Sequence, residues 1–531
     1  MNAAYGPVDA PELLSAGLVL GVAHPPGYLL MSLLERLALA LPVGGPAFRM
    51  NLVGPCALGL AASVFTGLAR KLVPAPPALG LAALFVLSPP VLGACGDAKG
   101  GAMLVSLAFF IGVMRLAFNP GAVSGNRSPT GAGLVTGLLL GLAAAHNALA
   151  VLPALAGATA LIPRPGGGRG RALRTRVVVA LMAVAGASVL VCGAIRAAAG
   201  PAVEWGRWDR LDGLLAILSW ARGWPEFGAG GVVEHFRSVT AYHGIPLVMA
   251  GMAVAGWAFG ARGPGPKTGP RFIAVSSVAF LLLLLPHDLR EPGLFYTLPL
   301  VPCALAGLAL LPPFVAAAKR HPVPLAASFG ALAVALMMAG APPGAGRWYF
   351  MDDLGRTTLA EVPEGKAVLF VLGDYDHDAI RFRQLACGEK TDCALVRVTV
   401  LDFPVYGDYR ARLKAVHPWL ALPSAGGKAG PAAIARLNSD RAWVGATAAL
   451  RAGGDAWPGL FALSGPGGSF TVPLAGSRPR GSIGRARSRG LFDERLYSEE
   501  WAHRFRRAWR HAASGAVSPS GAGRGGPFRA F

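Results

Sequence analysis

Two carboxylates near the amino terminus have the spacing of a functional pair. Asp9 and Glu12 are three residues apart, so a helical turn brings both side chains to one face. At a membrane surface such a pair can act as general base toward a hydroxyl or hold a divalent metal ion. The segment Gly21-Val-Ala-His24-Pro-Pro-Gly-Tyr28 follows and adds a histidine. The simpler interpretation of these residues is a solvated acidic turn before a rigid proline bend.

Two polar pairs interrupt the apolar sequence further along the chain. Asp97 and Lys99 stand in a short connection, where they form either a local ion pair or a site for a phosphate-bearing lipid. His146 and Asn147 separate two apolar runs. They form either a polar turn between helices or part of a cavity wall that binds a phosphate or a sugar hydroxyl.

Arg196 and Trp205 mark the start of a long polar segment. Arg196 ends an apolar run, and its guanidinium group suits a phosphate or a diphosphate. Trp205 belongs to a group of tryptophans that either anchor the chain at the membrane interface or stack on sugar rings. The sequence contains no Gly-rich phosphate loop, Cys/His metal quartet or nucleophile elbow.

The chain whose elements must position these residues has the composition of a membrane protein. Of the 531 residues, 53% are hydrophobic and 15% are charged, and the mean hydropathy is +0.49. Soluble domains have roughly a quarter of their residues charged. Apolar runs close to the ~20 residues that a membrane helix needs recur through the first two thirds of the chain. We predict an α-helical polytopic membrane protein with about ten spans, near residues 49–69, 77–95, 101–118, 131–145, 147–163, 177–195, 244–261, 272–287, 294–311 and 324–341.

Basic residues alternate between the loops that join these predicted spans. The net charge of +21 would suggest a nucleic-acid partner in a soluble protein. Here basic residues gather in every second loop, beginning with Arg70 and Lys71, and the positive-inside rule places those loops in the cytoplasm. Residues 1–48, 196–243 and everything after 341 then face outward in a multi-pass protein of the inner or plasma membrane. We expect no nucleic-acid partner. The chain begins outside with no span before it, which predicts a further helix upstream.

The outward segment 1–48 is predicted to hold the candidate catalytic acids and one amphipathic helix. Residues 28–43 look like another span, but Glu35 and Arg36 stand in the middle of the run. Charges at the centre of a bilayer are costly. A helix lying along the membrane surface is therefore the better interpretation.

After the predicted transmembrane domain, 49–341, polar and apolar residues are mixed. Lys366–Asp376 and Ala394–Leu401 have the pattern of buried strands, and the sequence between them is typical of a helix. This order predicts a small α/β domain over residues 342–473 on the outer face. Residues 474–531 are rich in Gly, Ser and Arg, which predicts a basic and largely disordered tail.

The cysteines have no metal-binding or redox spacing. Cys387 and Cys393 are six positions apart in the predicted α/β domain. They either close a small disulfide loop, if this domain faces an oxidising compartment, or remain thiols.

The residues considered so far resemble a known family. Asp9-Ala-Pro-Glu12 and Leu20–Tyr28 resemble the opening of the domain-of-unknown-function 2723 family, which is related to protein O-mannosyltransferases in the GT-C glycosyltransferase superfamily. The resemblance covers most of residues 5–410. It continues at Arg49–Asn51, Lys99–Gly101, Gly141–Asn147, Arg196–Pro201, Glu204–Gly206, Leu294–Pro299, Asp352–Arg356, Pro363–Gly365 and Gly373–Asp376.

The resemblance implies a GT-C-like fold with a catalytic acid in the first outward loop. Carried over to this sequence, Asp9 is the general base or the carboxylate that orients the acceptor, Glu12 supports it, and Asp97 stands near a second acidic position. The candidate substrate-binding residues are His24, Lys99, His146, Asn147, Arg196 and Trp205. The implied donor is a polyprenyl-phosphate-linked sugar, for example mannose. The implied acceptor is a protein Ser/Thr, a glycan or a lipid on the outer face.

Nothing in the sequence requires a cofactor, although two carboxylates also suit Mg²⁺ or Mn²⁺, so metal dependence stays open. Two other functions also stay open: a transporter or flippase of a lipid-linked or anionic substrate, and a catalytically inactive membrane scaffold. Transporters place ionisable residues near the bilayer midplane. The candidates here fall at the outward ends of spans and favour the glycosyltransferase.

Overall fold

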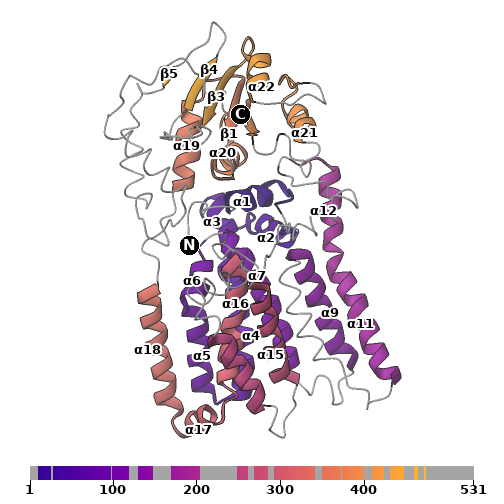
Figure 1. Ribbon diagram of the computed structural model, residues 1–531, viewed down its shortest axis with the longest axis vertical. Coiled ribbons are helices and arrows are strands. Elements are labelled where there is room, and N and C mark those ends of the chain that lie inside the picture. Colours follow the sequence, from indigo (N-terminus) through magenta and orange to yellow (C-terminus); the bar gives the residue numbers. More distant parts are fainter. Residues whose placement is uncertain are drawn as a thin grey trace, which may run out of the picture.

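The computed structural model has a helical bundle at one end and an α/β unit at the other, with three short helices between them (Figure 1). It describes residues 10–24, 28–96, 98–118, 129–147, 169–201, 203, 248–260, 268–284, 292–340, 350–371, 374–398, 401, 409–423, 431–447, 460–464 and 472–473.

The helices of the bundle overlap the predicted spans, apart from α17, which lies where the sequence predicts a basic loop between two spans. They are α4 (Val53–Leu72), α5 (Ala75–Leu87), α6 (Pro89–Ala94), α7 (Ala98–Ala117), α9 (Pro129–His146), α11 (Arg169–Ala187), α12 (Val189–Ala198), an apolar helix at Val248–Gly260, α15 (Thr268–Leu284), α16 (Pro292–Leu308), α17 (Pro312–Arg320) and α18 (Pro322–Gly340). The exception is the predicted span 147–163, which lies outside the described residues apart from Asn147.

The described helices differ in how well they could cross a bilayer alone. Pro46–Leu72, Ala98–Ala117 and Arg176–Ala198 are long and apolar enough. Leu298–Leu308 and Pro312–Arg320 pass the same test together, although they are bent by 71°. The other apolar helices of the described chain are shorter, so the expectation of about ten spans stays a prediction.

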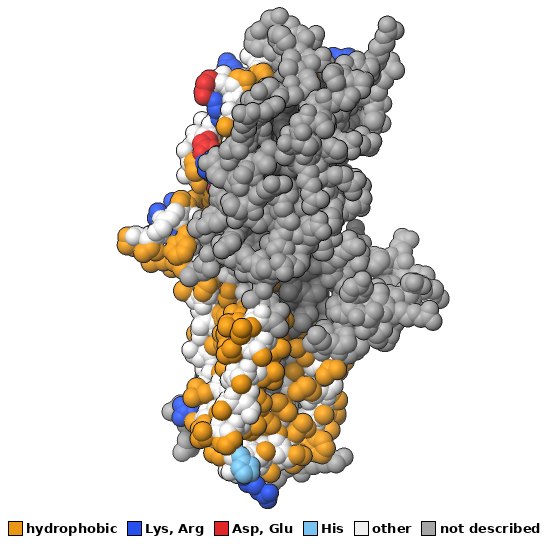
Figure 2. Space-filling view, turned by 90° about the vertical axis from the view of Figure 1, so that its left-hand side faces the viewer, with side chains coloured by type: hydrophobic (Ala, Val, Ile, Leu, Met, Phe, Trp, Pro, Cys, Tyr) orange, Lys and Arg blue, Asp and Glu red, His pale blue; other side chains and the backbone are white. Residues whose placement is uncertain are grey.

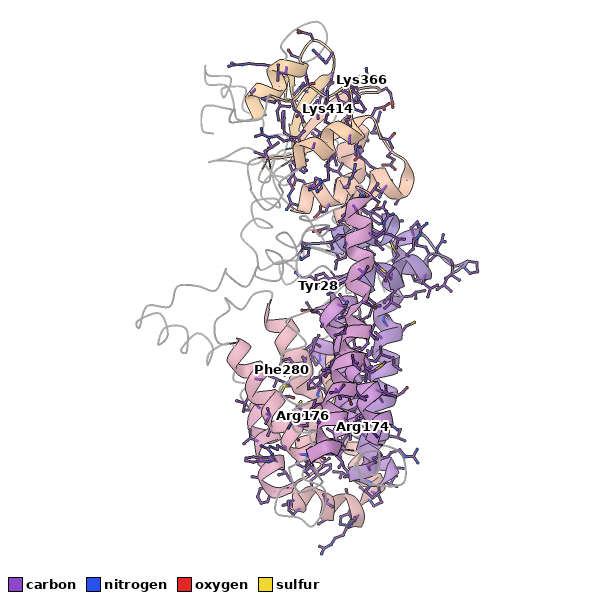
Figure 3. All side chains as sticks on the ribbon, turned by 90° about the vertical axis from the view of Figure 1, so that its right-hand side faces the viewer. Tyr28, Arg174, Arg176, Phe280, Lys366 and Lys414 are labelled. Carbon is purple, nitrogen blue, oxygen red and sulfur yellow. The ribbon has the colours of Figure 1, made fainter. Side chains whose placement is uncertain are left out.

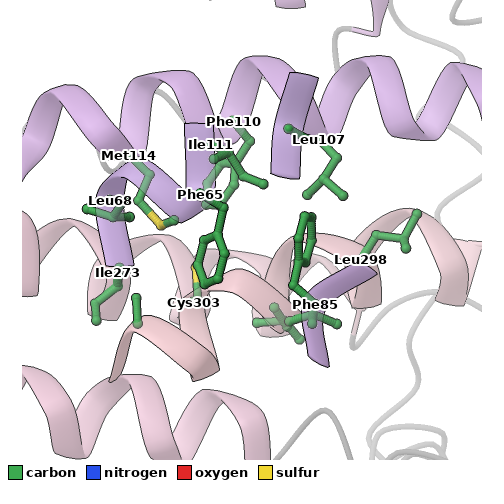
Figure 4. Close-up of a cluster of buried hydrophobic side chains, with 14 of the residues drawn as sticks. Phe65, Leu68, Phe85, Leu107, Phe110, Ile111, Met114, Ile273, Leu298 and Cys303 are labelled. Carbon is green, nitrogen blue, oxygen red and sulfur yellow. The ribbon is translucent and has the colours of Figure 1, made fainter. Parts of the chain in front are cut away.

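Aromatic side chains form the centre of the bundle (Figure 4). The rings of Phe65 and Phe85 are 5.2 Å apart, and Phe110 lies 5.6 Å from Phe272 and 5.3 Å from Phe280. These contacts join α4 to α5 and α7 to α15. Large apolar side chains also cover the outside, as Figure 2 shows over the lower half of the molecule. Val184, for example, is 70% exposed. An exposed apolar surface of this extent fits contact with lipid.

Glycines let two helices of the bundle approach closely. A Cβ atom at Gly137 would lie 2.3 Å from the carbonyl oxygen of Val179, and one at Gly141 would lie 2.1 Å from that of Ala183. Gly137 and Gly141 form a Gly-x-x-x-Gly pattern, which is typical of tightly packed membrane helices. The α9–α11 pair therefore depends on these small residues.

Basic residues gather at the end of the bundle away from the α/β unit. Figure 3 shows Arg174 and Arg176 toward this end, with Tyr28 higher up and Lys366 at the other end. The α17 helix, which closes the bundle at the same end in Figure 1, finishes at Lys319-Arg320. The predicted basic loops around these residues thus lie opposite the amino-terminal helix α1.

Three short helices form a layer between the bundle and the α/β unit: α1 (Ala10–Val19), α2 (Leu29–Ala38) and α3 (Pro46–Asn51). The α2 helix falls within the segment predicted to be amphipathic, and Leu37 on its surface is 70% exposed. Glu35, however, points inward and is fully buried against α1, where a Cβ atom at Gly17 would lie 2.5 Å from its Oε2 atom. Its neighbour Arg36 is exposed and donates a hydrogen bond to the carbonyl oxygen of Leu18 at 2.8 Å.

The α/β unit contains the predicted strand–helix–strand order. Its elements are α19 (Phe350–Glu361), β1 (Ala367–Val371), α20 (Asp374–Cys387), β2 (Cys393–Arg397), α21 (Tyr409–Val416), α22 (Pro431–Asn438), β3 (Trp443–Thr447), β4 (Leu460–Ser464) and β5 (Val472–Pro473). The sheet order is β2-β1-β3-β4-β5. β1 pairs in parallel with β2 and β3, and the pairs β3–β4 and β4–β5 are antiparallel. Cys387 and Cys393 are free thiols at the end of α20 and the start of β2.

The α/β unit rests on the layer of short helices through α20. Ala379 and Phe382 on α20 belong to the same buried apolar cluster as Leu13 and Leu14 on α1. Asp352 on α19 pairs with Arg383 on α20 at 2.5 Å, which fixes these two helices to each other. The α20 helix therefore connects the sheet to the amino-terminal helix.

Candidate functional site

Glu12 and His24 form a hydrogen-bonded pair at the start of α1. The Glu12 carboxylate is 3% exposed and accepts a hydrogen bond from the backbone N–H of His24 at 2.7 Å through Oε1. Its Oε2 atom lies 3.0 Å from Nδ1 of the His24 ring. Both oxygens of the carboxylate thus hold His24 in one orientation, as the carboxylate partner of a catalytic histidine does.

A tight turn after α1 brings His24 back to Glu12. The N–H of Gly21 donates to the carbonyl oxygen of Ala16 at 2.8 Å, and the N–H of Val22 donates to that of Val203 at 3.0 Å. A Cβ atom at Gly21 would lie 2.3 Å from the Val203 oxygen, so only glycine fits at this position. Gly21, which precedes the predicted bend, therefore allows Val203, far away in the sequence, to approach the turn closely.

Tyr28 connects His24 to His146. Its ring centre lies 5.6 Å from that of His24 and 5.9 Å from that of His146, in both cases edge to face. Tyr28 is 2% exposed and has a φ angle of 41°, which is uncommon for a residue with a Cβ atom. Sequence reasoning did not name Tyr28 as a site residue, although it ends the same motif as His24.

His146 is fully buried, with Nε2 at 2.7 Å from the carbonyl oxygen of Ala102. This contact connects the end of α9 to the first half of α7, beneath Tyr28. Of the two alternatives in the sequence, the described geometry favours a structural polar contact between helices, because the ring has no exposed surface. Asn147 follows it and is 2% exposed.

Arg196 caps the carboxyl end of α1. Its Nε and Nη2 atoms donate to the carbonyl oxygens of Leu20 and Val19, each at 2.9 Å. Helices end with unsatisfied carbonyl groups, which a basic side chain near the last turn can bind. The guanidinium expected to bind a phosphate is thus engaged in part by the backbone of α1.

Four predicted site residues remain, namely Lys99, Asp9, Asp97 and Trp205. Lys99 is partly buried in the first turn of α7. Asp9, Asp97 and Trp205 lie outside the described residues, so their proposed roles stay predictions.

A cleft of about 160 Å³ lies between α1 and the α/β unit. Glu12 and Ser15 line it from α1, and Arg381, Arg397 and Arg412 line it from α20, β2 and α21. Sequence reasoning missed these arginines because they stand on separate elements. The only signal in the sequence is the density of arginine from α20 to α21.

Burial changes the protonation of two histidines in this cleft. Burial, together with the charge of Arg381, lowers the pKa of His377 to about 3. Burial lowers the pKa of His417 to about 4, again with a contribution from Arg381. Both imidazoles are therefore neutral near pH 7. The positive charge of the cleft comes from its arginines.

The carboxylates of the site do not form a metal centre among the described residues. No group of three or more His, Cys, Asp or Glu side chains that could hold a metal ion occurs in this part of the chain. Asp9 and Asp97 lie outside it. The described Glu12–His24 pair instead orders the loop after α1, since both oxygens of the Glu12 carboxylate contact His24.

Two comparisons with known proteins bear on this arrangement. The fold resembles the crystal structure of ArnT from Cupriavidus metallidurans bound to undecaprenyl phosphate, with a TM-score of 0.55 at 13% sequence identity, over 83% of this chain and 89% of that chain. The chain has a helical membrane fold of the GT-C type. Residues 9–76 match the family model described as the protein O-mannosyl-transferase TMEM260 N-terminal domain, and this match contains the whole Glu12–His24 site.

Together, the two matches support a glycosyltransferase of the GT-C type related to protein O-mannosyltransferases. The narrower assignment to the domain-of-unknown-function 2723 family stays a prediction.

Proposed function

We propose that this protein transfers a sugar, mannose in the first instance, from a polyprenyl-phosphate donor to a hydroxyl group of a protein, glycan or lipid acceptor at the outer face of the membrane. The observation that carries the proposal is the Glu12–His24 pair at the junction of the bundle and the α/β unit, within the segment matched by the O-mannosyltransferase family model. The undecaprenyl phosphate of the ArnT structure supports a lipid-phosphate donor.

The transfer needs one base and one leaving group. The acceptor oxygen attacks the anomeric carbon, the bond from that carbon to the phosphate oxygen breaks, and the hydroxyl proton passes to the base. Inversion at the anomeric carbon follows when the base and the leaving phosphate lie on opposite sides of the sugar. The phosphate leaves as a stable anion, so strong acid catalysis is not required.

We assign the role of base to Asp9, which directly precedes α1 in the sequence, and a positioning role to Glu12. Glu12 holds His24 through both the backbone and the ring, so its oxygens are engaged in the described state. Glu12 therefore acts through the loop that it orders. The same experiment tests whether transfer depends on Mg²⁺ or Mn²⁺, because Asp9 and Asp97 are carboxylates that could contribute metal ligands.

The test is transfer of radiolabelled mannose from polyprenyl-phosphate mannose to an envelope fraction, in membranes that contain the full chain, with and without EDTA. Asp9→Asn should lower transfer at least ~100-fold, as expected when a general base is lost. Glu364→Gln is the matched control, since this carboxylate is 91% exposed in the α/β unit, and it should retain full activity. Normal transfer by Asp9→Asn would exclude Asp9 as the base. Absence of transfer by the wild type, with any sugar donor of this class, would favour a scaffold or a flippase.

Glu12 and His24 are tested as a unit. Glu12→Gln and His24→Gln should each lower kcat, and the double variant should lose little more than either single variant. Residues in one hydrogen-bonded pair give non-additive effects. Additive losses would mean that the two side chains act separately.

A further inference from the structure

An exposed run without polar side chains stands between α2 and α3. Residues 40–45 have the sequence Ala-Leu-Pro-Val-Gly-Gly, and all six are exposed. Leu41 is 43% exposed, Val43 is 45% exposed, and Leu37 at the end of α2 is 70% exposed. We call residues 37–43 the apolar tip. Figure 2 shows an apolar projection with basic side chains beside it, at the height where Figure 1 places α2 and α3.

The apolar side of α2 is used inside the protein. Met31 is fully buried in a cluster with Leu14 of α1 and Met50 of α3, and Leu30 and Leu34 pack against the same cluster. A helix that lies along a membrane places its apolar side in the lipid. This side of α2 is not available to lipid, so the apolar groups left for an outside partner are those of the apolar tip.

Arg49 fixes the shape of the apolar tip. Its Nη1 atom donates to the carbonyl oxygen of Leu39 at 2.8 Å, and its Nε atom donates to that of Gly44 at 3.2 Å. These two carbonyl groups lie on either side of residues 40–43. Gly44 has a φ angle of 60°, which glycine adopts without strain. The tip is therefore ordered before any partner binds, which lowers the entropic cost of binding.

The segment that bears the apolar tip exposes only positive charge. Arg36 is exposed, and its Nη1 atom donates to the carbonyl oxygen of Leu18 at 2.8 Å. Neither Arg36 nor Arg49 forms an ion pair with a carboxylate of the described residues. The one acid in residues 28–52 is Glu35, which is fully buried. Charge complementarity therefore favours an anionic partner beside the tip.

The place of the apolar tip in the molecule favours lipid over a protein. The bundle below it is covered by exposed apolar side chains, and its basic helix ends lie at the opposite end (Figures 2 and 3). The tip thus continues this apolar surface at the end that faces the α/β unit. Residues 40–45 have no polar side chain, whereas protein interfaces carry about one hydrogen bond per 100–200 Å². Membrane-binding segments place apolar side chains at the acyl boundary and cations among the lipid phosphates.

We propose that the apolar tip inserts into the lipid leaflet on the side of the α/β unit, and that Arg36 contacts the phosphate groups of anionic lipids there. The contact holds α2 and α3, and through them α1, at the level of the lipid headgroups. It requires no sugar transfer, so the proposal stands or falls independently of the proposed enzymatic activity.

The experiment is photo-crosslinking of the full chain in nanodiscs of phosphatidylcholine and phosphatidylglycerol. The photoreactive residue p-benzoylphenylalanine replaces Leu41, or Val43 in a second protein, and mass spectrometry identifies the molecule that becomes attached. The control carries the same residue in place of Leu437 on α22, because Leu41 and Leu437 are both 43% exposed. The charge is tested by Arg36→Gln, with Arg436→Gln as the matched control, since both arginines are exposed.

We expect lipid adducts at positions 41 and 43 to be at least tenfold more abundant than at position 437. The share of phosphatidylglycerol among the adducts at Leu41 should exceed its share in the disc, and Arg36→Gln, but not Arg436→Gln, should remove this excess. Equal adducts at all three positions would overturn the proposal, as would adducts of the tip with a second copy of the chain in place of lipid. An unchanged phosphatidylglycerol excess in Arg36→Gln would overturn the role of Arg36. A circular-dichroism melting curve for each variant separates loss of the contact from loss of the fold.

Discussion

At the scale of single residues, Glu35 is the least expected feature of the chain. Its carboxyl group is fully buried beneath α1, and neither of its oxygens has a hydrogen-bond partner. Burial raises the pKa of Glu35 well above its ordinary value. The sequence predicts a charged Glu35 side chain at the membrane surface. In the structure its carboxyl group is instead a neutral acid inside the protein.

This burial predicts a pH dependence of stability. In the unfolded chain Glu35 ionises near pH ~4.3, whereas the folded protein keeps it protonated to higher pH. Folding then takes up a proton above pH ~4.3, so the contribution of Glu35 to the free energy of unfolding falls as the pH rises. Glu35→Gln should flatten the decrease in melting temperature between pH 5 and pH 8 in detergent. Glu364→Gln, on an exposed carboxylate, should follow the wild type. An unchanged pH slope in Glu35→Gln would contradict the buried neutral acid.

The candidate site was predictable from the sequence only where its residues are neighbours in the chain. Asp9-Ala-Pro-Glu12 and the His24 bend could be found because one helical turn and one tight turn define them. The contact of Glu12 with the backbone N–H of His24 could not, because it depends on the Gly21–Val203 approach. Arg381, Arg397 and Arg412 meet only after the sheet has formed and docked, so no local pattern marks them.

At the scale of elements, long apolar runs predicted the helices of the bundle well. Hydropathy fixed where α4, α7 and α15 lie, because burial in lipid requires such runs. It did not predict which helices pair, since that depends on the small side chains that allow close approach. The pairing of α9 with α11 rests on Gly137 and Gly141.

Gly141 provides a test of that pairing. Gly141→Ala should lower stability by about 1–3 kcal/mol, the usual cost of overpacking, because the new Cβ atom would lie 2.1 Å from the Ala183 carbonyl oxygen. Gly59→Ala is the matched control on α4, where a Cβ atom would meet nothing within 4 Å. It should cause no loss. Thermal unfolding of both variants in detergent, followed by circular dichroism, measures the difference. Equal melting temperatures would show that α9 and α11 can separate at no cost.

At the scale of the whole molecule, the proposed transfer site lies at a contact between two parts of different architecture. The α7 helix of the bundle contacts α1 from below, the short helices α2 and α3 contact it within their layer, and the α/β unit covers it from above through α20 (Figure 1). Glu12 belongs to the proposed transfer site and also lines the cleft with the arginines. The position of the α/β unit therefore influences the surroundings of the proposed transfer site.

Phe382 is the side chain with which to test this dependence. It is 4% exposed in the cluster shared with Leu13 and Leu14, and replacing a buried Phe by Ala costs about 3–5 kcal/mol. In Phe382→Ala we expect faster hydrogen exchange of the α1 amides. Phe370→Ala removes an equally buried ring from the sheet core, away from α1, and should accelerate exchange in β1 while leaving α1 protected. Unchanged α1 exchange in Phe382→Ala would mean that the bundle alone orders the amino-terminal helix, and the α/β unit would then contribute only its arginines to the cleft.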